Sequence, residues 1–193
     1  MISDRKKEER VLRKKRIILG ALKVFNNHGI EKTTMDEIAH ESGFGKATLY
    51  YYFSSKDDIF VEIMEYGWRM LWEGIETKII EEVGPRKKFM GIVKKMGQTV
   101  TSNKVLYGFL FTAPNYIQES QKQSWKTYQE RLYAILQSII EEGIKKKEFV
   151  DMNPGLLMKA IGGLFHQLLI SNDEVLKEDE FELMLKNFLK PNV

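Results

Sequence analysis

Two short, capped helices near the N-terminus constrain the fold of this chain most strongly. Residues 34–37 form a capping box, in which the Thr34 hydroxyl can bind one free backbone N–H and the Glu37 carboxylate another. The helix that begins there must be short, because Gly43 ends it, and a second short helix is expected over residues 46–52. Two short helices joined by a tight turn predict a helix-turn-helix motif.

The residues inside this motif have the sizes that a helix-turn-helix needs. Ala39 is small where the two helices cross, and Gly43 can adopt a left-handed backbone conformation without steric cost. Ile38, Leu49 and Phe53 are apolar where the motif must pack on the preceding helix. An ordinary helical hairpin would need a small residue and a turn, but it would not need the three apolar residues as well. The combination therefore favours a helix-turn-helix.

The rest of the chain also has helical hydrophobic spacing. Helices are expected around Ile17–Gly29, from about residue 55, over 86–101, 106–111 and 120–147, from Pro154, and over 180–189. The sequence therefore predicts an all-α protein with about nine helices. We expect a helix-turn-helix DNA-binding domain with a basic N-terminal arm over residues 1–56, and a second helical domain over 57–193.

Composition excludes several classes of site. The 193 residues contain no cysteine, which rules out disulfides, thiolate zinc sites and cysteine nucleophiles. His28, His40 and His166 lack ligand spacing, and the sequence has no phosphate loop, paired catalytic motif or cofactor fingerprint. Neither an enzyme nor a bound cofactor or metal is expected. No apolar run approaches the ~18 residues of a membrane span, so we expect a cytoplasmic protein without a membrane partner.

Positive charge is concentrated in the N-terminal arm. Residues 1–16 hold eight Lys/Arg and three Asp/Glu, a net charge of 8 − 3 = +5, whereas residues 17–60 sum to 4 − 6 = −2 and residues 61–193 to 18 − 18 = 0. A basic arm before a folded segment commonly meets nucleic acid or an anionic membrane. The alternative is a solvated, frayed terminus.

The helix-turn-helix region resembles the DNA-binding signature of TetR-family transcriptional regulators. The resemblance rests on the segments 34–39 and 43–53 and on Lys56, and it covers about residues 10–60. The rest of the chain is similar only in length, helical content and helix order. Ser42, Phe44, Gly45 and Tyr52 depart from the usual family pattern, but Gly is an acceptable N-cap and a tyrosine hydroxyl can still donate to a phosphate.

The resemblance implies a recognition helix over residues 46–52 that enters the major groove of double-stranded DNA. Lys46 can approach guanine, Ala47 permits close approach and Thr48 can read a base edge. By family analogy, Tyr51, Tyr52 and Lys56 face phosphates, and the helix that Thr34 caps offers backbone N–H groups to another. The predicted DNA-binding residues are Thr34, Gly45, Lys46, Ala47, Thr48, Tyr50, Tyr51, Tyr52 and Lys56.

The resemblance further implies a C-terminal domain that binds a small molecule and forms a homodimer. Most of its aromatic residues are expected to belong to an ordinary core. Polar residues in apolar surroundings are better indicators of a ligand site, because a buried polar group must find a partner. The ligand candidates are Trp68, Trp72, Gln98, Tyr107, Phe111, Tyr116, Trp125, Tyr128 and His166. For His166, a core or interface position is the stronger alternative. No carboxylate cluster accompanies the aromatics, which favours a neutral or lipophilic effector.

The last two expected helices are the candidate dimer interface. Gly162-Gly163 costs ~1 kcal/mol per glycine relative to alanine in a helix, a cost that close approach of another helix would offset. The predicted interface residues are Leu157, Ile161, Leu164, Leu168, Phe181, Leu185 and Phe188, which from two copies would form a four-helix contact. The alternative is a purely intramolecular core.

Together these patterns predict a homodimeric, ligand-responsive regulator. As a repressor, it would bind a near-palindromic operator and be released by a small lipophilic or aromatic effector. The alternative is a helical DNA-binding or interaction protein without sequence specificity.

Overall fold

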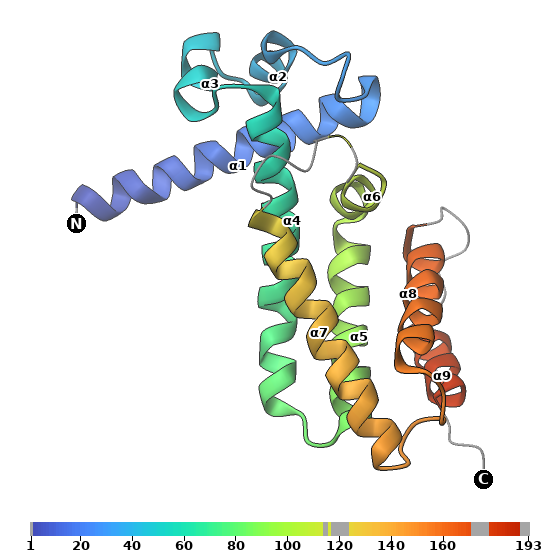
Figure 1. Cartoon of the computed structure of the whole chain (residues 1–193). Coiled ribbons are helices and arrows are strands. Elements are labelled where there is room, and N and C mark those ends of the chain that lie inside the picture. The colour runs from blue at the N-terminus through green and yellow to red at the C-terminus, as the bar shows by residue number, and fades with distance from the viewer. Residues whose placement is uncertain (1, 114–115, 117–123, 171–177, 190–193) are drawn as a thin grey trace. The chain divides into compact units, whose positions relative to one another are not determined.

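The computed structural model describes residues 2–113, 116, 124–170 and 178–189, and in these parts its regular elements are all helices. The helices are α1 (Ile2–His28), α2 (Met35–Ser42), α3 (Lys46–Tyr52), α4 (Lys56–Glu81), α5 (Pro85–Ser102), α6 (Lys104–Thr112), α7 (Ser124–Lys145), α8 (Pro154–Ile170) and α9 (Glu178–Phe188) (Figure 1). The expected all-α fold with an N-terminal helix-turn-helix is confirmed.

The chain divides into two compact units. Unit 1 comprises residues 1–67 and 108–124, and unit 2 comprises residues 68–107 and 125–193. Helix α4 contributes residues to both units, as does α6, whose residues 108–112 lie in unit 1. The domain boundary expected after residue 56 remains a prediction. Each compact unit combines segments that are far apart in sequence, because the units are defined by tertiary packing.

Local signals determine the helix-turn-helix as the sequence predicts. The backbone N–H of Thr34 donates to the Glu37 carboxylate at 2.7 Å, and the Thr34 hydroxyl accepts from the Glu37 N–H at 3.3 Å, so the capping box is complete. Gly43 ends α2 with φ at 69°, and Gly45 is the N-cap of α3. Leu49 is fully buried and anchors α3 to the rest of the motif.

The basic arm forms the first half of a long helix. Helix α1 begins at Ile2 and continues through the arm to His28 (Figure 1). Residues 4–13 are exposed, whereas Ile17, Ala21 and Phe25 are buried. The frayed terminus considered above is therefore not observed in residues 2–16; the apolar half of α1 packs in unit 1 and the charged half faces solvent.

An aromatic cluster explains why the end of α6 belongs to unit 1. The Phe109 ring of α6 stacks on Phe25 of α1 with centroids 5.8 Å apart, and it meets Phe60 of α4 edge-on at 5.8 Å. Tyr116 packs against Phe60 at 5.3 Å and donates its hydroxyl hydrogen to Asp57 at 3.0 Å. Burial and this hydrogen bond raise the pKa of Tyr116 to about 12.

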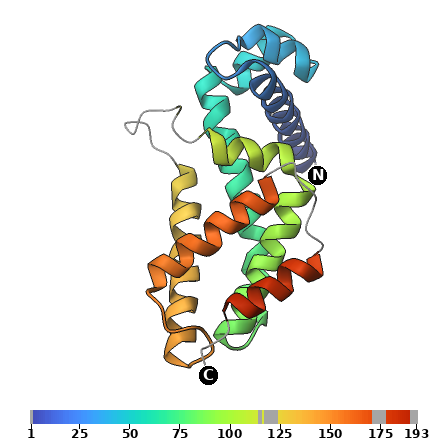
Figure 2. The ribbon, with the colours of Figure 1, turned by 90° about the vertical axis from the view of Figure 1, so that its right-hand side faces the viewer.

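Arg86 connects three elements of unit 2. Helix α5 contacts α8 and α9, which cross in front of it in Figure 2. At the start of α5, the Arg86 guanidinium donates to the Glu148 carbonyl at 2.9 Å and to the Lys186 carbonyl near the end of α9 at 2.6 Å. Carbonyls at a helix C-terminus lack intrahelical partners, so Arg86 satisfies groups of α9 that the helix itself cannot.

Candidate nucleic-acid interface

Helix α3 presents a polar face opposite its buried anchor. Leu49 is buried, while the side chains of Lys46, Ala47, Tyr50 and Tyr51 are exposed. Thr48 and Tyr52 are more exposed than Leu49. Tyr51 is the most exposed of the three consecutive tyrosines 50–52, at 72%.

Lys46 is held by a neighbouring carboxylate. Its ammonium lies 2.9 Å from Asp36 in the first turn of α2. The hydrogen bond to Asp36, together with the attraction of its negative charge, raises the pKa of Lys46 above its ordinary value. Lys46 is thus a permanent cation at neutral pH, and a base or phosphate that binds it competes with Asp36.

The N-terminus of α2 already has a carboxylate. Both the backbone N–H and the hydroxyl of Thr34 donate to Glu37, at 2.7 and 2.9 Å, and these bonds lower the pKa of Glu37. The predicted phosphate at this helix end would therefore lie near an ionised side chain. A phosphate contact by Thr34 remains a prediction, but its donors have partners within the chain.

Lys56 has a structural role that the sequence did not indicate. Its ammonium donates to the backbone carbonyls of Ile30, Glu31 and Thr33 at 2.9, 2.7 and 3.2 Å. A lysine ammonium has three hydrogens, so all of them are engaged. The predicted phosphate contact would require Lys56 to give up one of these bonds, because the loop before α2 takes its full donor capacity.

Two residues that depart from the usual family pattern, Ser42 and Phe44, contact Arg16 of α1, Ser42 through its backbone carbonyl and Phe44 through its ring. The Arg16 guanidinium lies over the Phe44 ring, 4.8 Å from its centroid, and donates to the Ser42 carbonyl at 3.3 Å. The Ser42 hydroxyl donates back to the Ile38 carbonyl at 2.6 Å. These contacts attach the turn of the helix-turn-helix to α1, so Ser42 and Phe44 are compatible with the motif.

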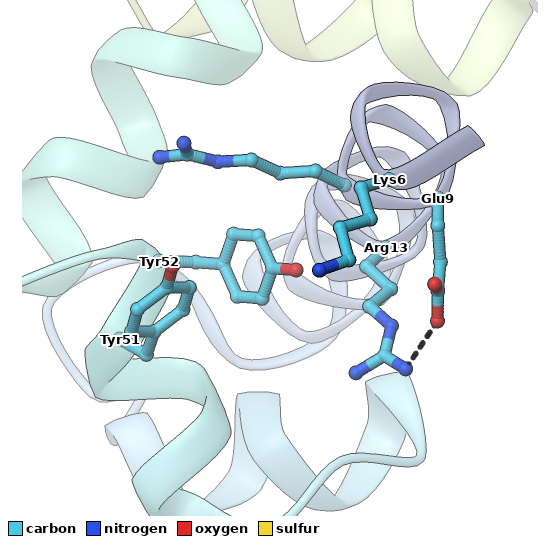
Figure 3. Close-up of a pocket in the computed structure, with 6 residues that line it drawn as sticks. Lys6, Glu9, Arg13, Tyr51 and Tyr52 are labelled. Atoms are coloured by element: carbon cyan, nitrogen blue, oxygen red, sulfur yellow. Dashed lines mark hydrogen bonds and ion pairs between the residues drawn. The ribbon is translucent and has the colours of Figure 1, made fainter. Parts of the chain in front are cut away.

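A basic groove that the sequence analysis did not identify lies beside α3. It has a volume of about 350 Å³ and separates the exposed half of α1 from the end of α3. Its lining residues are Lys6, Glu9, Arg10, Arg13, Tyr51 and Tyr52 (Figure 3). The α1 residues have the i, i+3, i+4, i+7 spacing of one helix face, a signal that becomes visible once the arm is known to be helical.

Comparisons with known proteins identify the family. Residues 17–63 match the family model described as bacterial regulatory proteins, tetR family. The HTH-type transcriptional regulator BetI of Agrobacterium fabrum is 27% identical to this chain, over 92% of the chain and 90% of the relative. Residues 17–63 thus carry the DNA-binding region of the TetR family, and together these matches support a TetR-family transcriptional regulator. The chain is accordingly a DNA-binding transcriptional regulator, and α3 is the second helix of its helix-turn-helix.

Two solved structures, one of them a TetR family transcriptional regulator, share the fold of this chain. PfmR from Thermus thermophilus superposes with a TM-score of 0.76 and 20% identity, covering 89% of this chain and 95% of that chain. AibR in complex with isovaleryl coenzyme A and operator DNA superposes with a TM-score of 0.80 and 16% identity, covering 92% and 97%. At these identities the likeness establishes the fold.

The ligand candidates of this TetR-family chain lie in both units. Trp68, Trp72, Tyr107 and Trp125 are buried in unit 2, and the partly exposed Tyr128 belongs to the same unit. Phe111 and Tyr116 belong to unit 1 and are partly exposed. Gln98 and His166 are exposed on their helices rather than buried in the single chain, and an interface position for His166 stays a prediction.

Two features of unit 2 stand out among these candidates. The indole N–H of Trp125 is buried without a hydrogen-bond partner among the described residues. A buried donor without a partner is costly. Arg131 of α7 places its guanidinium over the Trp72 ring, 4.1 Å from the centroid. Unit 2 therefore offers an unused donor and a stacked cation near buried aromatic surface.

The predicted dimer residues separate into three groups. Leu157, Ile161 and Leu185 are buried within a single chain, so their side chains are used by the core of unit 2. Leu164 is partly exposed, and the side chains of Leu168, Phe181 and Phe188 lie outside the described residues. On the same two helices, Leu156 and Leu183 are 57% and 60% exposed.

The described residues contain neither a membrane-spanning helix nor a cluster of metal ligands. In the part of the chain that the structure describes, none of the helices combines the length and apolar character needed to cross a membrane. Within the same residues, His, Asp and Glu side chains form no group of three that could hold a metal ion.

Proposed function

We propose that this TetR-family regulator is a homodimeric repressor that binds a near-palindromic operator through α3 and is released by a small lipophilic or aromatic effector. The observation that carries the proposal is the division of α3 into a buried anchor, Leu49, and an exposed face with Lys46, Ala47 and Tyr50. A helix of this kind can enter the major groove and expose donors, a small residue and apolar surface to base edges.

The proposed homodimer accounts for the operator symmetry. Two recognition helices related by a two-fold axis would read half-sites about one helical turn apart. Exposed Leu156 on α8 and Leu183 on α9 supply apolar surface. Among the described residues, no heavy atom lies within 4 Å of a Cβ placed at Gly162 or Gly163, which allows a second helix to approach.

The proposed effector response rests on unit 2 and on α4 and α6, which contribute residues to both units. The indole N–H of Trp125, which has no hydrogen-bond partner among the described residues, is a suitable donor for a carbonyl oxygen on an otherwise apolar molecule. AibR, a structural neighbour, is known in complex with isovaleryl coenzyme A and operator DNA. Effector and DNA would oppose each other by linkage, each lowering affinity for the other by the same factor.

Selection of DNA by the full-length protein tests the proposal. A random duplex library should yield an inverted repeat, and the selected duplex should bind far more tightly than a shuffled one at a fixed salt concentration. Mass spectrometry of molecules that co-purify with the protein should identify an apolar compound that weakens this binding. Equal affinity for both duplexes would favour the alternative, a DNA-binding protein without sequence specificity.

A further inference from the structure

The groove between α1 and α3 has the chemistry of an anion site. Lys6, Arg10 and Arg13 supply three cations against one carboxylate, Glu9, so the groove carries a net charge of 3 − 1 = +2. In Figure 3, Tyr52 extends from α3 toward α1, and both Tyr52 and Lys6 line the groove. The Tyr51 ring meets the Tyr52 ring edge-on, with centroids 5.2 Å apart.

The cations of the groove are more available to a ligand than other cations of α1, whose side chains make contacts within the chain. Lys14 pairs with Glu62 at 2.6 Å, and Arg16 is engaged with the turn after α2. Lys6 and Arg10 have no ion-pair partner among the described residues, and both are exposed. Arg13 pairs with Glu9 at 2.5 Å, and this pair is also open to solvent.

We infer that this groove is a second phosphate-binding site of the DNA interface, which holds a backbone phosphodiester beyond the bases read by α3. The inference rests on the proposed operator binding through α3. Arginine and lysine cations with hydroxyl donors are the groups that bind DNA phosphates. Tyr51 and Tyr52 are part of both α3 and the groove, so a duplex seated on α3 places one of its strands beside Lys6 and Arg10.

An anionic membrane fits the groove less well than DNA. Apart from the two tyrosine rings, its lining side chains are all charged, whereas a helix that binds a membrane surface needs a broad apolar face. A concave site between two helices also suits a strand that can enter it better than a flat headgroup layer.

Glu9 is expected to limit the affinity of the groove. Its carboxylate occupies Arg13 and repels a phosphate that approaches Lys6 or Arg10. DNA must therefore displace Glu9 from Arg13 or use the remaining cations. Replacement of Glu9 by glutamine removes the negative charge and nearly preserves shape, so this variant should bind DNA more tightly than the wild type.

Salt titrations of full-length variants test the inference. The probes are the duplex selected by the wild-type protein and a shuffled duplex of the same composition. Lys6→Ala and Arg10→Ala should each make the slope of log K against log salt less steep on both duplexes. The expected change is about 0.9 for each phosphate that is no longer neutralised, or about 1.8 in the proposed homodimer. Glu9→Gln should raise affinity for both. The matched control is Lys7→Ala, which removes the same charge from α1 outside the groove lining.

Ethylation interference gives a second readout at the level of single phosphates. In each half-site, ethylation of one flanking phosphate should block the wild-type protein but should no longer matter for Arg10→Ala. The inference is overturned if Lys6→Ala and Arg10→Ala match Lys7→Ala, or if Glu9→Gln leaves affinity unchanged. It is also overturned if these variants alter binding only to phosphatidylserine vesicles. If the wild-type protein bound the selected and the shuffled duplex equally well, the proposed operator binding would be contradicted instead.

Discussion

The Lys46 ammonium lies 2.9 Å from the Asp36 carboxylate, so the first residue of α3 is paired with the first turn of the preceding helix. Both side chains are exposed, at 61% and 64%. DNA that binds Lys46 must compete with Asp36, and this pair is therefore expected to affect both the affinity and the specificity of the interface.

Variants of this pair should separate base reading from general attraction. Lys46→Ala should lose about 5- to 150-fold more affinity on the selected duplex than on a shuffled one for each bidentate pairing with a base that the variant removes. Asp36→Asn should tighten binding to both duplexes, because it releases Lys46 and removes a negative charge. Titrations at one salt concentration measure these ratios. Equal losses for Lys46→Ala on both duplexes would show that Lys46 only anchors a phosphate.

Lys56→Met should reduce stability rather than the number of phosphate contacts. It removes three charge-assisted hydrogen bonds to the loop carbonyls of residues 30–33, at an expected cost of about 2 kcal/mol in the free energy of unfolding. Urea unfolding measures this cost, with Lys32→Met as the control because Lys32 is an exposed lysine of the same loop. The salt slope of DNA binding should remain unchanged; a fall of about 0.9 per protomer would assign Lys56 to a phosphate.

Tyr116 should make stability depend on pH in the alkaline range. Its pKa is raised to about 12 in the folded chain, above the ordinary value of about 10 in an unfolded one. The neutral phenol is thus favoured by folding, and its contribution is fully present below pH ~10 and is lost as the pH rises toward ~12. Tyrosinate absorbance should show one late-titrating group that is missing in Tyr116→Phe. A wild-type titration identical to that of Tyr116→Phe would contradict the part-buried hydrogen bond to Asp57.

Two glycine substitutions in helices of unit 2 should have opposite effects on stability. A Cβ at Gly143 would collide with the Phe149 ring, so Gly143→Ala should lower the free energy of unfolding by about 1–3 kcal/mol. A Cβ at Gly162 would meet no heavy atom of the described residues within 4 Å, so Gly162→Ala should raise stability by up to ~1 kcal/mol. Thermal unfolding at low protein concentration compares them. A destabilised Gly162→Ala protein would indicate that a neighbouring helix already occupies that space.

The proposed interface should be disrupted by charge on its exposed leucines. Leu156→Glu and Leu183→Glu should yield monomers, and Leu168→Glu should do the same if that residue shares the interface. These monomers should lose affinity for the selected duplex, because single half-sites lack the gain from effective concentration. Sedimentation gives the oligomeric state, and Leu12→Glu is the control on an exposed leucine of α1. Dimers that persist in both main variants would place the interface elsewhere.

The sequence by itself determined the helix-turn-helix, because each of its signals acts within a few residues. The Thr34–Glu37 capping box, the left-handed Gly43 and the N-cap Gly45 are properties of single turns, and the structure reproduces them. The burial of Leu49 followed from helical spacing in the same way. Local hydrogen bonds and backbone preferences are encoded in short stretches of chain, so they can be recognised without knowledge of the remaining fold.

Only the tertiary structure decided which partners the long side chains find. Lys56 donates to carbonyls more than 20 residues away, Arg86 reaches the end of α9, and Phe109 packs in unit 1. The groove beside Tyr52 exists because the arm is helical and passes that residue. Lysine and arginine are flexible and can satisfy their donors on any nearby acceptor. Their roles therefore depend on which segments packing brings together, and the spacing of residues along the chain does not contain that information.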